Sequence, residues 1–186
     1  MTTKVPNELL EIGVLADATN FTDSILISQN ASTGTLSSAT DNVGIGDDVF
    51  AALTSGRNSV AIGSNSLDAN TSGKNNVAVG HDALTANTTA DSNTAIGKST
   101  LEANTTGTRN VAIGALALAA NTTANDNVAI GGGTSGVSFA ALAANTTGQY
   151  NTAIGNSALA ANTTADYNTA IGYAALLDNT TGTRNT

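Results

Sequence analysis

The sequence contains no cysteine and no tryptophan, and it has a single proline. Without cysteine, the chain has neither a disulfide framework nor a cysteine-ligated metal site. Aromatic residues make up only 3% of the 186 residues, and the 40% of hydrophobic residues are mostly alanine and small aliphatic residues. This composition predicts a thin, stacked core in place of the thick core of an ordinary globular domain.

Positive charge is also scarce, with 6 Lys and Arg against 14 Asp and Glu and a net charge of −8. A nucleic-acid-binding face needs clustered Lys and Arg, so we expect no nucleic-acid partner. No apolar run approaches the roughly 20 residues of a membrane span, so we expect no membrane insertion. The N-terminus lacks the apolar core of a signal peptide. We therefore expect a chain that is made in the cytoplasm and is not exported by the general secretory route.

The dominant feature is an internal repeat. Asn-Thr-Ala-Ile-Gly at residues 151–155 recurs at residues 168–172, which gives a 17-residue period. The closing glycine of this motif recurs at Gly46, Gly63, Gly80, Gly97, Gly114, Gly131, Gly155 and Gly172. These glycines keep the same 17-residue spacing throughout, except for a 24-residue step between Gly131 and Gly155. A fixed period of this length indicates a repeat architecture.

The repeat unit predicts a strand, a turn and an apolar anchor. Within Asn-Val-Ala-Ile-Gly the two β-branched residues are two apart and share one face of a strand, while alanine lies on the other. We place the β-branched face in the core. The predicted core residues are Ile62, Ile96, Ile113, Ile130, Ile154, Ile171, Leu84, Leu101, Leu118 and Leu159. The small alanine on the opposite face suggests that another segment approaches it closely.

Each unit also contains two corners. The repeated glycine allows a backbone angle that other residues resist, so the chain turns there. Asn-Thr-Thr makes the second corner, because asparagine tolerates the left-handed region and can bond nearby backbone groups. Two corners and two short strands in each unit predict an all-β fold, a β-solenoid or β-roll of 17-residue coils. Ala-Leu-Ala-Ala is too short to nucleate a helix. The Asn-x-Thr/Ser triplets match glycosylation acceptors, but their periodic recurrence favours a role in the corner.

The chain divides into three predicted parts. Residues 1–24 break the repeat and are expected to form an extended N-terminal arm, although a frayed terminus is an open alternative. Residues 25–40 contain the strand-like Ser24–Ser28 run and are expected to form a degenerate capping coil. Residues 41–186 are the repeat array, with a seven-residue insertion near residues 132–138 that we place in a surface loop.

The insertion and the single histidine are the strongest candidates for chemistry, and both are weak. Gly131, Gly133 and Gly136 fit G-x-G-x-x-G, but neither the following helix nor the acidic residue of a dinucleotide site is present. His81 stands beside Asp82 at a variable, outward position. We therefore predict no catalytic residue, no metal ligand and no cofactor, and we do not expect an enzyme. The charged and aromatic side chains that vary between units, plausible surface or partner contacts, are Arg57, Lys98, Arg109, Tyr150, Tyr167, Tyr173 and Arg184.

The repeats over residues 42–186 resemble two related groups of proteins. Asn-Ser-Val-Ala-Ile-Gly at Asn58–Gly63 is similar to the head repeats of trimeric autotransporter adhesins, although those repeats are usually shorter. Ala-Ile-Gly-x-x-Ala-Leu-x-x-Asn-Thr-Thr-Gly resembles repeats in bacteriophage tail fibres, and Thr3–Leu10 resembles the start of tail-fibre proteins. Because an adhesin must be exported and a virion protein must not, the missing signal peptide favours the tail fibre.

The tail-fibre resemblance implies a parallel homotrimeric fibre that is located in the virion and attached by its N-terminus. Its implied partners are itself, a phage tail or baseplate/portal-region protein bound by the arm, and a host receptor bound beyond residue 186. The arm residues expected to contact the virion are Val5, Pro6, Leu9, Leu10 and Ile12. Because Arg184-Asn185-Thr186 opens another unit, we also expect a longer parent protein.

Two alternatives stay open. A bacterial surface adhesin would be favoured by a longer reading frame with an upstream signal peptide. An ice-binding β-solenoid would need outward threonines alternating as Thr-x-Thr, whereas the threonines here are adjacent at a corner.

Overall fold

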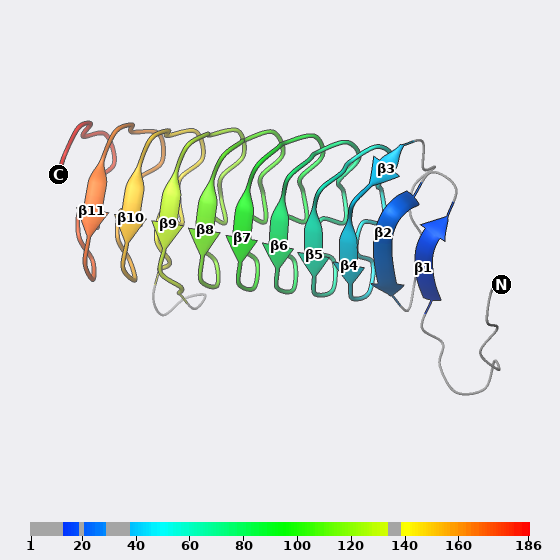
Figure 1. The fold of residues 1–186 in the computed structure, drawn as a ribbon. Coiled ribbons are helices and arrows are strands. Elements are labelled where there is room, and N and C mark those ends of the chain that lie inside the picture. Colours follow the sequence, from blue (N-terminus) through cyan, green and yellow to red (C-terminus); the bar gives the residue numbers. More distant parts are fainter. Residues whose placement is uncertain (1–12, 19–20, 29–37, 134–138) are drawn as a thin grey trace.

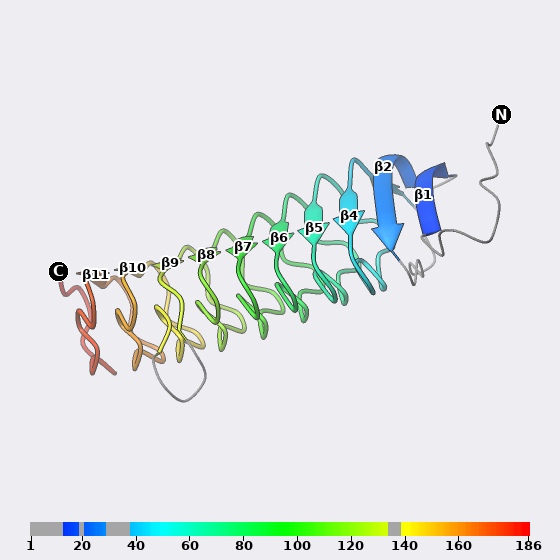
Figure 2. The same cartoon turned by 90° about the horizontal axis from the view of Figure 1, so that it is seen from below.

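The computed structural model describes residues 13–18, 21–28, 38–133 and 139–186, which form a rod of stacked coils (Figures 1 and 2). All regular structure in these residues is β, in one sheet of 11 strands. One three-residue strand comes from each coil of the array. These strands are β4 (Val43–Ile45), β5 (Val60–Ile62), β6 (Val77–Val79), β7 (Thr94–Ile96), β8 (Val111–Ile113), β9 (Val128–Ile130), β10 (Thr152–Ile154) and β11 (Thr169–Ile171). The predicted β-solenoid of 17-residue coils is therefore confirmed.

The strands stack in parallel, and equivalent residues lie opposite one another. Ile96 pairs with Ile113, and Ile113 pairs with Ile130, so isoleucines of neighbouring units occupy neighbouring layers as predicted. The register continues across the insertion, where Val128 pairs with Thr152. At about 4.8 Å for each step between neighbouring strands, β4 and β11 are roughly 34 Å apart.

The N-terminal end of the stack is covered by three further strands. These are β1 (Gly13–Ala18), β2 (Phe21–Ser28) and β3 (Ala39–Thr40). β2 pairs in parallel with β4 and β3, and it pairs antiparallel with β1. The predicted strand at Ser24–Ser28 is present within β2, and β1 and the start of β2 lie within residues 1–24, the segment predicted to be the arm. β1 pairs with β2, and Phe21 and Thr22 of β2 pair with β3, so these residues belong to the sheet. The edge of β4 itself is covered by Ile25, Leu26 and Ile27 of β2.

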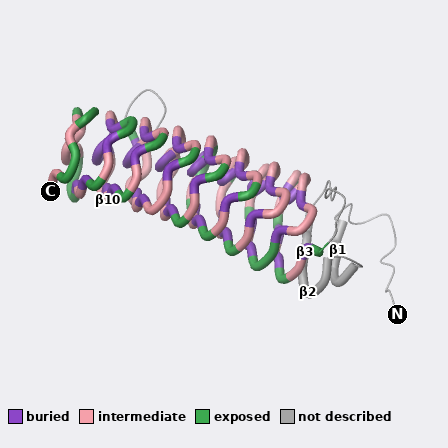
Figure 3. The backbone as a smooth tube through the Cα atoms, turned by 90° about the horizontal axis from the view of Figure 1, so that it is seen from above, coloured by how far each residue is buried: buried purple, intermediate pink, exposed green. Residues whose placement is uncertain are grey.

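The core is made of leucine and alanine. The predicted core leucines Leu84, Leu101, Leu118 and Leu159 are fully buried, and they form one cluster with the strand alanines, such as Ala95 and Ala112. Buried positions recur in every regular coil along the rod (Figure 3).

The prediction for the isoleucines is wrong. Ile62, Ile96 and Ile171 are exposed by 36%, 39% and 68%, and Ile113, Ile130 and Ile154 are only half-buried. The alanine at the centre of each strand points inward instead, which exchanges the two faces of the strand. The coil explains the exchange: the leucine from the opposite side already fills the narrow interior, so only a methyl group fits beneath the strand.

Each coil contains one strand where two were predicted. The segment opposite the strand is a series of turns, because its leucine adopts a left-handed conformation, with φ between +51° and +57° from Phe50 to Leu176. A left-handed leucine costs about 1–2 kcal/mol. Full burial of the side chain contributes about 1.5–3 kcal/mol, which offsets this cost.

Two columns of buried asparagines run along the interior. In the first column, at the start of the strands, the Oδ1 of Asn93 accepts the backbone N–H of Asn110 at 3.0 Å, and the Nδ2 of Asn110 donates to the carbonyl of Ala124 at 2.8 Å. In the second column, at the Asn-Thr-Thr corner, the Nδ2 of Asn121 donates to the Oδ1 of Asn104 at 2.9 Å and also to the carbonyl of Ala124 at 3.2 Å. The columns satisfy corner carbonyls that have no partner in a strand.

Burial also explains the triplets that resemble glycosylation acceptors. The side chains of their asparagines are fully buried at Asn70, Asn87, Asn104, Asn121, Asn145 and Asn162. Their periodic recurrence therefore reflects the structure of the corner.

Candidate functional site: the strand face and its flanks

The strands present an uncharged outer surface, which we call the strand face. It consists of the first and third residues of β4 to β11, which are Val43, Ile45, Val60, Ile62, Val77, Val79, Thr94, Ile96, Val111, Ile113, Val128, Ile130, Thr152, Ile154, Thr169 and Ile171. The inward direction of the central residue forces these side chains outward. The result is a ladder of apolar and threonine side chains that repeats once for each coil.

The strand face has two flanks. The leading flank contains the residue two positions before each strand, at Asp41, Asn58, Asn75, Ser92, Arg109, Asp126, Tyr150 and Tyr167, and it ends with Arg184 at the equivalent position after β11. The trailing flank contains the residue after each turn glycine, at Asp47, Ser64, His81, Lys98, Ala115, Gly132, Asn156 and Tyr173.

The leading flank has direct contacts between neighbouring coils. Nε and Nη2 of Arg109 donate to the two carboxylate oxygens of Asp126, each at 2.7 Å, and this hydrogen bonding lowers the pKa of Asp126. Tyr150 and Tyr167 stack with their ring centroids 4.9 Å apart, and the guanidinium of Arg184 lies 5.2 Å from the Tyr167 ring centre. The stacking distance equals the spacing of the coils, so the solenoid itself holds the rings in contact.

Large aromatic surface remains exposed on both flanks. Tyr150 and Tyr167 are each 48% exposed on the leading flank, and Tyr173 is 81% exposed on the trailing flank. Tyr167 and Tyr173 belong to the same layer, because they precede and follow β11. We therefore regard this end of the strand face as the part best suited to contact another molecule.

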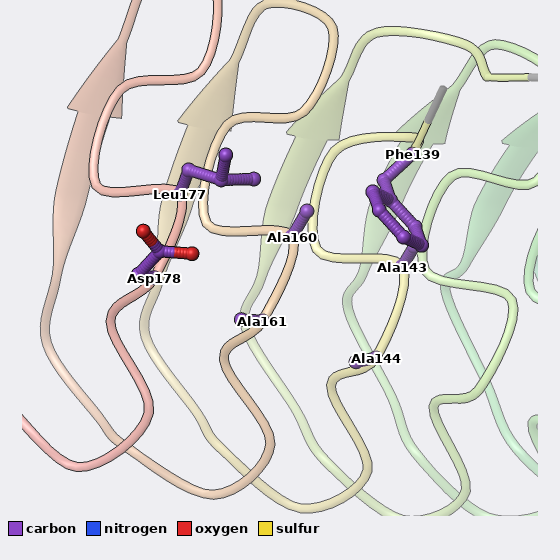
Figure 4. A pocket seen from close by; sticks show the side chains of 7 residues that line it. All are labelled: Phe139, Ala143, Ala144, Ala160, Ala161, Leu177 and Asp178. Atoms are coloured by element: carbon purple, nitrogen blue, oxygen red, sulfur yellow. The ribbon is translucent and has the colours of Figure 1, made fainter. Parts of the chain in front are cut away.

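A second feature is an apolar groove on the segments that connect the strands. Phe139 and Leu177 lie at its ends, and small alanines such as Ala143 and Ala160 lie between them, with Asp178 at the rim (Figure 4). The volume of the groove is about 450 Å³, and Phe139 is 64% exposed. The groove is confined to the C-terminal coils, because the positions equivalent to Ala143 in earlier coils include Asp68 and Glu102.

The candidates for acid–base chemistry do not form a larger constellation. His81 Nδ1 lies 2.5 Å from the carboxylate of Asp82, and the imidazole is exposed. Partial burial, together with the nearby charge of Asp48, raises the pKa of Asp68. Within the described residues there is no group of three or more His, Asp or Glu side chains arranged to hold a metal ion.

The other predicted site residues are the expected virion contacts and the turn glycines. The expected virion contacts Val5, Pro6, Leu9, Leu10 and Ile12 lie outside the described residues. The turn glycines of all eight units have φ between +116° and +152°, where a side chain is strained.

Sequence reasoning missed the strand face as a surface. The one available signal was the 17-residue spacing of Tyr150 and Tyr167, which places two aromatic rings in one column.

In the part of the chain that the structure describes, no helix has the length and apolarity needed to cross a membrane. No protein family, curated protein or solved structure matches the chain.

Proposed function

We propose that this chain is a structural rod that assembles with parallel copies of itself into a homotrimer. In this proposal it forms the N-terminal part of a phage tail fibre or another virion-attached fibre. The proposal is supported by the β-solenoid and by the resemblance of the Ala-Ile-Gly-x-x-Ala-Leu repeats to tail-fibre repeats.

The strand face is the observation that carries self-assembly. Its exposed isoleucines include Ile45, Ile62 and Ile96, at 41%, 36% and 39%, and none of its residues is charged along eight strands. An uncharged and mostly apolar surface of this kind on the outside of a rod is typical of an interaction site.

The spacing of the strand face favours another copy of the chain as the partner. The apolar side chains repeat once for each layer, at about 4.8 Å. A partner that fills the gaps between them along the whole rod needs the same spacing, which a second copy has. An uncharged interface also lets rods with a net charge of −8 approach one another closely.

The proposed role also requires a stiff rod and attachment of the fibre at its N-terminus. Every coil is bonded to its neighbours through the strands and the asparagine columns, so the rod resists bending along its axis. In the fibre, Val5, Pro6, Leu9, Leu10 and Ile12 of each arm bind a tail, baseplate or portal-region protein. Regions beyond residue 186 contact the host receptor.

The test is the oligomeric mass in solution. We expect the native chain to have three times the monomer mass of 18.3 kDa by light scattering coupled to size-exclusion chromatography. The double variant Ile96→Lys/Ile113→Lys, which places charges on the strand face, should be monomeric. Thr106→Lys/Thr123→Lys changes exposed corner residues in neighbouring coils and is the matched control, which should stay trimeric. Circular dichroism should show the same β content in all three proteins.

Two results would contradict the proposal. One is a native chain that stays monomeric at micromolar concentration. The other is an Ile96→Lys/Ile113→Lys variant that keeps the native oligomeric mass, because the strand face would then not be the interface.

A further inference from the structure

We infer that Tyr167 of one copy and Tyr173 of the next copy form an aromatic contact between subunits at the β11 end of the rod. This inference rests on the proposed self-assembly through the strand face and adds the residues that define its alignment. Tyr167 lies on the leading flank and Tyr173 on the trailing flank of the same strand, and both rings are exposed.

Symmetry determines which flanks meet. In a closed ring, the copies are related by rotation about an axis parallel to the rods. When each copy turns its strand face toward that axis, the leading flank of one copy meets the trailing flank of the next. This holds for two copies as well as for three. The contact therefore follows from parallel association and does not depend on the number of subunits.

Symmetry also determines the register. A pure rotation carries no translation along the axis, so each layer of one copy lies beside the same layer of the next. A shift between copies would produce an open helical stack instead of a closed ring. Tyr167 and Tyr173 belong to the layer of β11, so they meet in the aligned assembly.

The charges on the flanks allow this alignment in every layer except that of β4, where Asp41 of one copy lies beside Asp47 of the next. In register, Arg109 lies beside Ala115, and Ser92 lies beside Lys98, so no like charges face each other in these layers. A shift of one layer in one direction would place Arg109 beside Lys98, and the two positive charges would repel each other.

On the leading flank, the Tyr167 ring is already held in a fixed position in which it can contact an aromatic partner. The Tyr167 ring is held between Tyr150, at 4.9 Å between ring centroids, and Arg184, at 5.2 Å from its centre. A ring fixed on both faces still presents its edge. It loses little freedom when Tyr173 of another copy packs against that edge.

The experiment uses cysteine crosslinking, which is clean because the chain has no native cysteine. Tyr167→Cys and Tyr173→Cys chains, carrying different tags, are co-expressed and treated with a short bismaleimide. We expect a crosslinked dimer that contains both tags, whereas either variant alone should give none. Ser92→Cys with Lys98→Cys, another pair in one layer, should also crosslink. Ser92→Cys with Tyr173→Cys lies in layers far apart and serves as the negative control.

Three outcomes would overturn the inference, and light scattering on the same samples distinguishes them. A monomeric mass refutes both the self-assembly and the contact. An oligomer in which the Tyr167 and Tyr173 cysteines do not crosslink refutes the contact alone. Crosslinking of Tyr167→Cys chains with one another refutes the parallel contact, because it requires like flanks of the β11 layer to meet, as they do about a two-fold axis that is perpendicular to the rods and lies in that layer.

Discussion

At the scale of single residues, the asparagines explain how so thin a coil keeps its backbone groups bonded. The strand of a regular 17-residue unit, such as Val111–Ile113, is only three residues long. The remaining backbone needs other partners, and the two asparagine columns supply many of them. The carbonyl of Ala124 accepts from both columns, through Asn110 and Asn121.

The first prediction concerns Asn121. Asn121→Ala removes the donor to Asn104 and to the Ala124 carbonyl, and it removes the acceptor that receives the Nδ2 of Asn145 at 3.3 Å. The Ala124 carbonyl still accepts from Asn110, and the Nδ2 of Asn145 still donates to the carbonyl of Gly148, so mainly the Oδ1 of Asn104 is left unpaired. An unpaired buried polar group costs about 1–3 kcal/mol, and we expect a loss of that size. Urea unfolding followed by circular dichroism measures it. The exposed control Thr123→Ala should change stability by less than about 0.5 kcal/mol. Equal stability of the two variants would contradict the role of the column.

At the scale of the elements, the turn after each strand is determined by contact with the next coil as much as by its own conformation. Gly97 has a φ of +135°, and a Cβ added there would lie 2.7 Å from the carbonyl carbon of Gly114. The glycine column therefore allows the coils to stack at the spacing of a parallel sheet.

The second prediction follows from this contact. Gly97→Ala should destabilise the rod by about 3 kcal/mol or more, because backbone strain adds to a clash with the backbone of the next coil. The neighbouring Lys98 is exposed and differs between units, so Lys98→Ala should be nearly silent. Thermal unfolding of both variants measures the difference. Equal melting temperatures of the Gly97→Ala and Lys98→Ala proteins would contradict this prediction, because the coils could then move apart without a loss of stability.

At the scale of the whole molecule, the two ends of the described rod differ. β1 and β2 extend the sheet beyond β4 at the N-terminal end, so these two strands belong to the rod. Only residues 1–12 remain as candidates for a separate attachment arm, and the arm should be tested by removing those residues alone.

The third prediction is therefore a deletion of residues 2–12. The truncated chain keeps β1 and β2, so we expect native β content and native oligomeric mass. If the chain is the proposed trimeric fibre, its incorporation into particles should be lost, because the proposal attaches the fibre through three linked arms, which bind far more tightly than one arm alone. A particle assay that compares native and truncated fibres checks this. Normal incorporation of the truncated fibre would place the attachment site elsewhere, and loss of the fold would assign residues 2–12 to the cap.

The period of the repeat was decisive for what could be read from the sequence. The 17-residue spacing of the turn glycines predicted the coil and the stacking of Ile96 on Ile113. It also predicted the corners, because glycine and Asn-Thr-Thr have strong local conformational preferences. The buried leucine was evident from its constant position within the unit.

Only the tertiary structure decided which face of each strand is inside. Val111-Ala112-Ile113 alternates in sequence, and alternation identifies two faces without saying which one is buried. The choice depends on the space left by Leu118, which reaches the interior from the opposite side of the coil and leaves room only for the methyl group of Ala112. The outward isoleucines and the meeting of Tyr150 with Tyr167 in one column are likewise consequences of stacking. Both depend on residues that are a full coil apart in the sequence and become neighbours only when the coils are closed.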